Sequence, residues 1–252
     1  MVPEHVLTAF QSDTAEAPQQ LGPEWGNGDR VGTVVYAEST DTSHWSGTVR
    51  DKLDVPGLRI SRPILSSDGR TVVAGWTANT FIDGAPQLRI DETVSAALRL
   101  TDALWQVQGP VGLQRDDDFA VAEREAWAEC DERYGEIDAP GQVGHADMVG
   151  TTIYDGTRTP GLTDVVPFVV PRPYAMTAAT AIADLLILAP GDTVDDSVVS
   201  RFGHVPDLKR LVLRALAYRR HVAERHDFAP SNAVSNIRRI EETLVSRWSD
   251  TI

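Results

Sequence analysis

Three residues capable of acid–base or metal chemistry lie in the segment Val143–Pro173. His145 and Asp147 are two positions apart, and Asp164 follows 17 residues after Asp147. Two carboxylates brought to the same end of a hairpin would hold a divalent metal or activate a hydroxyl group. Aspartate is also a preferred turn residue, so these residues alone leave an ordinary turn open as the alternative.

A β-hairpin is the element expected to position the two acids. The segments 149–154 and 161–165 have strand character, and the sequence DGTRTP between them is typical of a turn. In that arrangement Asp147 and Asp164 arrive at the same end of the hairpin.

The rest of the chain separates into a β-rich portion followed by a helical one. A β-branched run at 31–38 and a hairpin from 58–64 to 71–78 are predicted strands. Apolar spacing predicts helices over 3–10, 42–53, 119–134, 174–189, 196–202, 208–225 and 231–248, and a further helix from residue 89. This order predicts a two-lobed α+β fold: an N-terminal β-rich lobe over 1–78, a hinge over 79–83 and a helical C-terminal lobe over 84–252.

A glycine-bearing loop precedes the first strand pair. Gly22, Gly26 and Gly28 would let backbone amides approach a phosphate. The strict spacing of a phosphate-binding loop is absent, which favours an ordinary surface hairpin.

Composition excludes several classes of function. The 252 residues carry a formal charge of −14, which argues against a nucleic-acid partner because phosphate neutralisation requires cations. Cys130 is the single cysteine, so no disulfide forms within the chain. Without a leader pattern or a long apolar run, we expect a cytoplasmic protein with no membrane association; its partner, a small molecule or a protein, is not identified by the sequence.

Two blocks of sequence carry a resemblance to a known fold family. Residues 145–154, HADMVGTTIY, and 162–171, LTDVVPFVVP, are similar to an HGDLxGNVLF block followed by an IDxxPYWRP-like block. The chain thereby resembles the aminoglycoside phosphotransferase and choline kinase branch of the protein-kinase-like fold, and more narrowly a family of uncharacterised actinobacterial proteins. The resemblance extends over about residues 5–248, although only 143–173 is specific.

The resemblance implies a role for each residue of the segment. Asp147 would be the catalytic base that accepts the proton of a substrate hydroxyl, with His145 as a structural histidine before it. Asp164 would bind magnesium beneath the nucleotide phosphates. Asp184 would be an acid that supports the catalytic loop.

Some of the residues that bind the nucleotide and its metal ions in the family pattern are absent from this sequence. The resemblance places Trp76 at the approach to the hinge and Thr151 or Thr152 where an asparagine normally holds a second metal. The lysine expected on the strand 31–38 is absent, since Tyr36 and Ala37 occupy its candidate positions and no lysine precedes Lys52. Mg-ATP is the cofactor that the resemblance implies, and the absence of this lysine argues against it. Arg30 or Arg50 would be the substitute cation.

Two functions remain open on these residues. One is a catalytically impaired, pseudokinase-like binding or scaffolding protein, and the other is an active ATP-dependent small-molecule phosphotransferase. The acidic run 116–118 would suit a cationic acceptor or simply begin a helix. A weaker hypothesis is the docking of an acidic partner on a late helix through Lys209, Arg210, Arg214, Arg219 and Arg220.

Overall fold

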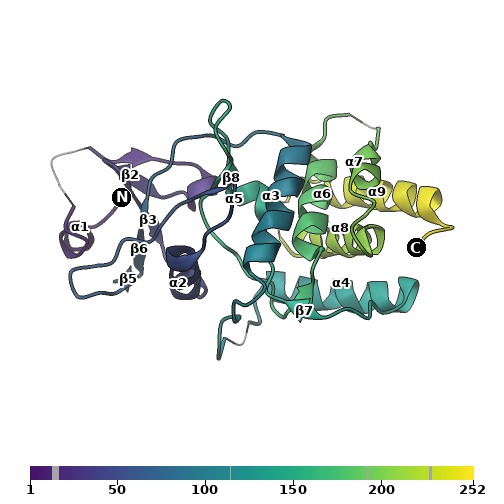
Figure 1. Cartoon of the computed structure of the whole chain (residues 1–252), viewed down its shortest axis with the longest axis horizontal. Coiled ribbons are helices and arrows are strands. Elements are labelled where there is room, and N and C mark those ends of the chain that lie inside the picture. The colour runs from purple at the N-terminus through teal and green to yellow at the C-terminus, as the bar shows by residue number, and fades with distance from the viewer. Residues whose placement is uncertain (13–16, 114, 192, 227–228) are drawn as a thin grey trace. The chain divides into compact units, whose positions relative to one another are not determined.

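The computed structural model describes the chain except residues 13–16, 114, 192 and 227–228. The chain forms two compact units, one made of Met1–Gln87 with Gly150–Val166 and the other of Leu88–Val149 with Pro167–Ile252 (Figure 1). The first is sheet-rich and the second helical, so the predicted α+β class is confirmed. The predicted boundaries at 78 and 84 stay predictions.

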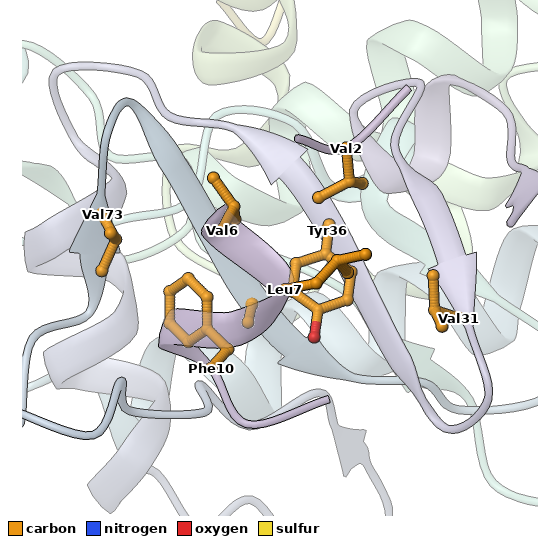
Figure 2. Close-up of a cluster of buried hydrophobic side chains, with 8 residues drawn as sticks. Val2, Val6, Leu7, Phe10, Val31, Tyr36 and Val73 are labelled. Atoms are coloured by element: carbon orange, nitrogen blue, oxygen red, sulfur yellow. The ribbon is translucent and has the colours of Figure 1, made fainter. Parts of the chain in front are cut away.

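An antiparallel sheet organises the first unit. It has the order β1-β2-β3-β6-β5, with bounds β1 Gln19–Gln20, β2 Asp29–Val31, β3 Val34–Glu38, β6 Trp76–Thr80 and β5 Val72–Val73. The short helix α1 Glu4–Ala9 contributes Val6 to a buried cluster that also contains Phe10, Tyr36 and Val73 (Figure 2). This cluster buries the apolar side of the predicted N-terminal helix.

The segment around the predicted acidic hairpin forms a smaller sheet in the same unit. Strand β9 Gly161–Leu162 pairs antiparallel with β8 Thr152–Ile153 and parallel with β4 Arg59–Ile60. The predicted strand from Val149 is wrong at its start, because α5 Met148–Thr151 is helical and only two residues find a partner strand. The predicted hairpin from 58–64 to 71–78 is wrong at Arg59–Ile60, because these two residues pair with β9. Within 71–78, β5 and β6 pair with each other, and in the first arm Arg62, Pro63 and Ile64 contact the end of β6. Helix α2 Ser43–Lys52 matches its prediction.

The second unit is built from helices around a central apolar one. Its elements are α3 Ile90–Ala103, α4 Asp118–Tyr134, α6 Met176–Leu188, α7 Ser197–Arg201, α8 Leu208–Arg225 and α9 Ala233–Trp248, with β7 Gly141–Gln142 paired to β10 Arg172–Pro173. Helix α6 is buried on nearly all sides and contacts α3, α8 and α9. Within the described ranges, no helix is both long and apolar enough to cross a bilayer.

The acidic run 116–118 lies at the N-terminus of helix α4. Asp117 caps it by accepting a hydrogen bond from the Ala120 amide at 3.0 Å. The predicted buried face is confirmed for Ala122, Ala126 and Cys130. It is wrong for Phe119, which is exposed and contacts the ring of His226.

Three of the five basic residues of the predicted docking face on α8 are largely buried within the helical unit. Arg214 and Arg220 are buried, and Arg220 donates to both carboxylate oxygens of Glu129 at 2.7 and 2.8 Å. Arg219 pairs with Asp184. The hypothesis of a basic docking face is therefore wrong for these three arginines.

Glu129 gives the helical unit a pH-dependent contribution to stability. Although burial opposes it, hydrogen bonds from Arg220 and His221 lower the pKa of Glu129 from 4.5 to about 2. A depressed carboxyl pKa stabilises the fold above the unfolded value and loses this contribution as the pH falls through about 2. We expect Glu129→Gln to cost about 1–2 kcal/mol at pH 6 and less at pH 3 in urea unfolding. An equal cost at both pH values would contradict this.

Candidate functional site

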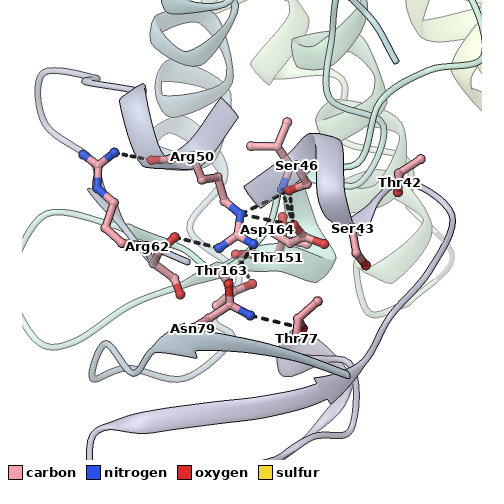
Figure 3. A network of polar contacts seen from close by, with 12 residues as sticks. Thr42, Ser43, Ser46, Arg50, Arg62, Thr77, Asn79, Thr151, Thr163 and Asp164 are labelled. Carbon is pink, nitrogen blue, oxygen red and sulfur yellow. Dashed lines mark hydrogen bonds and ion pairs between the residues drawn. The ribbon is translucent and has the colours of Figure 1, made fainter. Parts of the chain in front are cut away.

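Asp164, the predicted metal ligand, follows β9 and forms an internal hydrogen-bonded cluster in the sheet-rich unit. Its Oδ1 atom accepts the Ser46 hydroxyl of α2 and the Val165 amide, the latter at 2.8 Å (Figure 3). The guanidinium Nε of Arg50 lies 3.3 Å from the same oxygen. The Asp164 side chain is 44% exposed, so the carboxylate is held on one side and open to water on the other.

Arg50 is the buried cation of this cluster. The residue is only 4% exposed, and its Nη1 donates to the Ser61 carbonyl at 2.7 Å and its Nη2 to Asn79 Oδ1 at 2.9 Å. Nε also donates to Ser46 Oγ at 3.1 Å. All three guanidinium nitrogens are thus directed at protein groups, which fixes the orientation of the charge.

Burial lowers the pKa of Arg50, and the neighbouring Arg62 adds to this effect, whereas Asp164 opposes it. Arg62 donates to the main-chain carbonyl of Arg50. Arginine retains its proton in proteins, so a fixed positive charge remains against Asp164 at any ordinary pH.

Strand β3 carries no replacement for the missing lysine. Tyr36 is fully buried and its ring makes an edge contact with Phe10, while Ala37 lies opposite Thr77 in the sheet. Of the two arginines proposed as substitutes, Arg50 reaches Asp164 from α2. Arg30 instead places its guanidinium 3.7 Å above the ring of Phe81.

Trp76, a predicted cofactor contact, lies elsewhere in the sheet-rich unit. It pairs with Glu38 and packs against the buried cluster of α1 and the sheet. It also lines a pocket of about 540 Å³ with Gly26, Gly28, Asp29 and Glu38. The Glu38 carboxylate would repel a triphosphate there, whereas the charge of Asp29 is offset by the Met1 ammonium 3.3 Å from its Oδ2 atom, and no lysine or arginine is among the lining residues.

Thr151, the other predicted cofactor contact, is buried at the end of α5. Its carbonyl oxygen accepts the Thr163 amide at 3.0 Å, and the Thr163 hydroxyl lies 3.0 Å from the same oxygen while it donates to the Glu24 carbonyl at 2.7 Å. These contacts join α5 to the residue before Asp164 (Figure 3). The backbone of Thr151 therefore supports the position of Asp164, while its role as a metal ligand stays a prediction.

The predicted catalytic loop lies in the helical unit. His145 is fully buried, and its amide donates to the Thr177 hydroxyl at 2.9 Å. Asp147, half-buried, directly precedes α5. The Ala146 carbonyl between them accepts a hydrogen bond from Arg219 Nη2 at 2.9 Å.

Asp184 fixes the arginine that holds this loop. Arg219 donates Nε and Nη2 to the two Asp184 oxygens at 2.6 and 2.7 Å. Burial raises the pKa of Asp184, the nearby Asp147 carboxylate adds to the rise, and Arg219 opposes it. Asp184 therefore contacts the loop through Arg219, in agreement with the supporting role that the resemblance implies.

Two clusters therefore hold the predicted residues, one in each unit. Asp164 and Thr151 belong to the sheet-rich unit, whereas His145 and Asp147 belong to the helical one. Sequence reasoning missed Ser46 and assigned Arg219 to a docking face. The four-residue spacing of Ser46 and Arg50 on one face of α2 is the signal that could have indicated the former.

The surroundings of the Asp164 carboxylate fit a magnesium ion poorly. One Asp164 oxygen is shared with a buried guanidinium, and two unit charges 4 Å apart interact by about 4 kcal/mol at an effective dielectric constant of 20. A divalent ion on this carboxylate would lie near the fixed positive charge of Arg50, which repels it.

Solved structures resemble this fold over nearly its whole length. An aminoglycoside phosphotransferase from Alicyclobacillus acidocaldarius has a TM-score of 0.52 and 14% identity, covering 99% of this chain and 97% of that one. A choline kinase from Cryptosporidium parvum has a TM-score of 0.57 and 8% identity, covering 95% and 91%. The chain has a protein-kinase-like fold.

A third similar structure is the GDP complex of aminoglycoside 2'-phosphotransferase-IIIa, with a TM-score of 0.52 and 12% identity over 96% of this chain and 97% of that one. No protein-family model and no curated protein matches the sequence. At these identities the likeness establishes the fold alone. The narrower resemblance to actinobacterial proteins stays a prediction.

Proposed function

We propose that this phosphotransferase-like protein has lost Mg-ATP-dependent phosphoryl transfer and acts as a binding or scaffolding protein. The observation that carries the proposal is the Arg50–Asp164 pair. Phosphoryl transfer depends on cations positioned around the triphosphate, and on magnesium held by a carboxylate. Here the carboxylate is already paired with a buried internal cation whose nitrogens all donate to protein groups.

A second candidate function is an active small-molecule phosphotransferase, with Asp147 as base and Asp164 as metal ligand. The exposed side of the Asp164 carboxylate and the Arg219 contact that holds the Asp147 loop favour it. Arg50 would then have to turn toward a phosphate, giving up its bonds to Ser61 and Asn79.

Nucleotide titration followed by thermal unfolding distinguishes the two functions. A ligand at a hundred times its dissociation constant stabilises a protein by about 2.7 kcal/mol, roughly 5–11 °C for a domain of this size. We expect no magnesium-dependent shift of the wild type with Mg-ATP or with Mg-GTP, the latter included because one similar structure is a GDP complex.

The matched variant is Asp164→Asn, with each protein compared with and without nucleotide. A shift in the wild type that disappears in this variant would contradict the proposal and support the active phosphotransferase. Transfer of phosphate to a hydroxyl acceptor, lost in Asp147→Asn, would do the same.

A further inference from the structure

The two faces of the five-stranded sheet have different neighbours. On β6, Trp76 and Ala78 pack with the buried cluster of α1, whereas Asn79 directs its side chain to Arg50 (Figure 3). Successive side chains of a strand point to opposite faces of a sheet. Trp76 therefore lies on the face opposite the Arg50–Asp164 pair, and its surroundings form a different surface of the sheet-rich unit.

Glu38 is the cross-strand neighbour of Trp76 on that face. The two residues are directly opposite in the antiparallel pairing of β3 with β6, which places their Cβ atoms about 4.5–5.5 Å apart. Glu38 is exposed and Trp76 half-buried, and both line the pocket of about 540 Å³. The other acid of this pocket, Asp29, pairs with the Met1 ammonium at 3.3 Å. Among the described residues no lysine or arginine lines the pocket, so Glu38 and Trp76 hold no basic side chain there.

The loop between β1 and β2 lines the same pocket, but its amides are used internally. It contains the 3₁₀ helix η1 Pro23–Trp25, after which the Asn27 amide donates to the Gly22 carbonyl and the Gly28 amide donates to the Trp25 carbonyl. Amides that are bonded within the loop are not directed at a phosphate. Together with the Glu38 carboxylate, this makes the pocket suited to a positively charged group.

The helical unit contains the same two types of side chain with an arginine bound to both. Glu123 and Trp127 are four residues apart on α4, a spacing that brings Cβ atoms to about 5–6 Å. Arg172 donates Nε to Glu123 at 2.7 Å, and its guanidinium lies 4.0 Å from the centroid of the Trp127 ring. One guanidinium thus pairs with a carboxylate and lies over an indole at once. A glutamate and a tryptophan at this separation form a receptor for an arginine side chain.

Glu38 and Trp76 repeat this pair at a similar separation, without the arginine. A guanidinium suits them better than an ammonium, because it is planar, lies flat on an aromatic face and donates from a fixed fork to a carboxylate. A pocket of about 540 Å³ has room for a side chain and its adjoining backbone, since cavities of this size hold drug-sized molecules. The formal charge of −14 would also attract a basic partner.

We infer that Glu38 and Trp76 form a docking site, the arginine site, for an arginine side chain of a partner protein. The guanidinium pairs with Glu38 and covers the Trp76 ring. The side-chain amides of Gln20 and Asn27 also line the pocket, where they can hydrogen-bond the backbone beside that arginine. The inference rests on the binding role in the proposed function and gives that role a partner chemistry, but it does not depend on the loss of phosphoryl transfer.

Titration with short capped peptides, followed by the amide and indole NMR signals of the protein, tests the inference. A peptide with one arginine among glycines is expected to shift the signals of Glu38 and Trp76 saturably, with a dissociation constant on the order of 1–10 mM. The same peptide with citrulline keeps the planar shape without the charge and should bind roughly two- to fivefold more weakly. A lysine peptide should also bind more weakly, because an ammonium has no fork and no flat face.

Two variants remove the two halves of the arginine site. Glu38→Gln and Trp76→Leu should each weaken binding of the arginine peptide roughly two- to fivefold. The matched controls are Asp51→Asn, exposed on α2, and Trp105→Leu, at a position 58% exposed in the helical unit, and both should leave the affinity unchanged. Trp76 also packs against the cluster of α1, so the exposed Glu38→Gln decides the test if Trp76→Leu does not fold.

Equal affinity for the arginine and citrulline peptides, or binding unchanged in Glu38→Gln, would overturn the arginine site and leave the loss of transfer standing. N-acetylargininamide lacks the flanking backbone and should bind more weakly than the peptide. Equal affinity for the two would overturn the assignment to a protein partner in favour of a small cation. Magnesium-dependent transfer by the wild type would instead overturn the proposed function and leave the measured binding of arginine intact.

Discussion

Replacement of Arg219 by methionine is expected to lower the free energy of unfolding by about 3–5 kcal/mol. The guanidinium donates to both oxygens of Asp184 and to the carbonyl of Ala146. Methionine retains an apolar stem but leaves the Asp184 carboxylate largely buried beside Asp147, without a counter-charge. Urea unfolding followed by circular dichroism measures the loss.

Removing both charges separates the loss of the ion pair from the cost of leaving one buried charge without its partner. The double variant Arg219→Met/Asp184→Leu should recover most of the loss, because a buried pair is replaced by apolar groups. Arg201→Met is the matched control, since Arg201 makes a similar bond of 2.8 Å to Asp91 at an exposed position. An exposed pair contributes about 0–1 kcal/mol. Equal losses in the Arg201 and Arg219 variants would show that burial of the pair does not matter.

A local measurement separates support of the loop from general stability. Without the Arg219 bond to Ala146, the amides around Asp147 should exchange with solvent faster than those of α8, on which Arg219 lies. A uniform change across the helical unit would indicate loss of packing alone.

Helices were predictable because their apolar spacing is local. Helix α8 has the bounds that its pattern predicted, and α2 and α4 agree to within one residue at each end. Short strands were less predictable. The β-branched residues after Val149 favoured a strand, yet pairing begins only at Thr152, where β9 supplies a partner.

The partners of the site residues could not be predicted from spacing. Arg219 meets Asp184 from 35 residues away, and Ser46 meets Asp164 from 118. A sequence identifies the acids of such pairs but not the partner that packing brings to them. The burial of Trp25 is similar, because its neighbours Val35, Phe81 and Ile153 come from three separate segments.

Replacement of Arg50 by methionine is the second large expected effect, a loss of about 2–4 kcal/mol in the free energy of unfolding. Methionine removes the donors to the Ser61 carbonyl and to Asn79 Oδ1 and the counter-charge of Asp164. The partly exposed Asp164 carboxylate can be hydrated once Arg50 is gone. The expected loss in the free energy of unfolding is therefore smaller than for Arg219→Met. Arg70→Met is the matched control, since its pair with Asp68 is exposed.

Neutralising Asp164 distinguishes an internal ion-pair partner from a metal ligand, because the two roles predict different changes in the free energy of unfolding. Asp164→Asn should destabilise the metal-free wild type by about 1–3 kcal/mol but cost much less in the Arg50→Met background, since the two residues interact directly. A carboxylate held only for a metal would show no such coupling to Arg50. If Arg50 instead anchors a phosphate, Arg50→Met would abolish a nucleotide-dependent shift that the wild type displays, and the active phosphotransferase would be the better account.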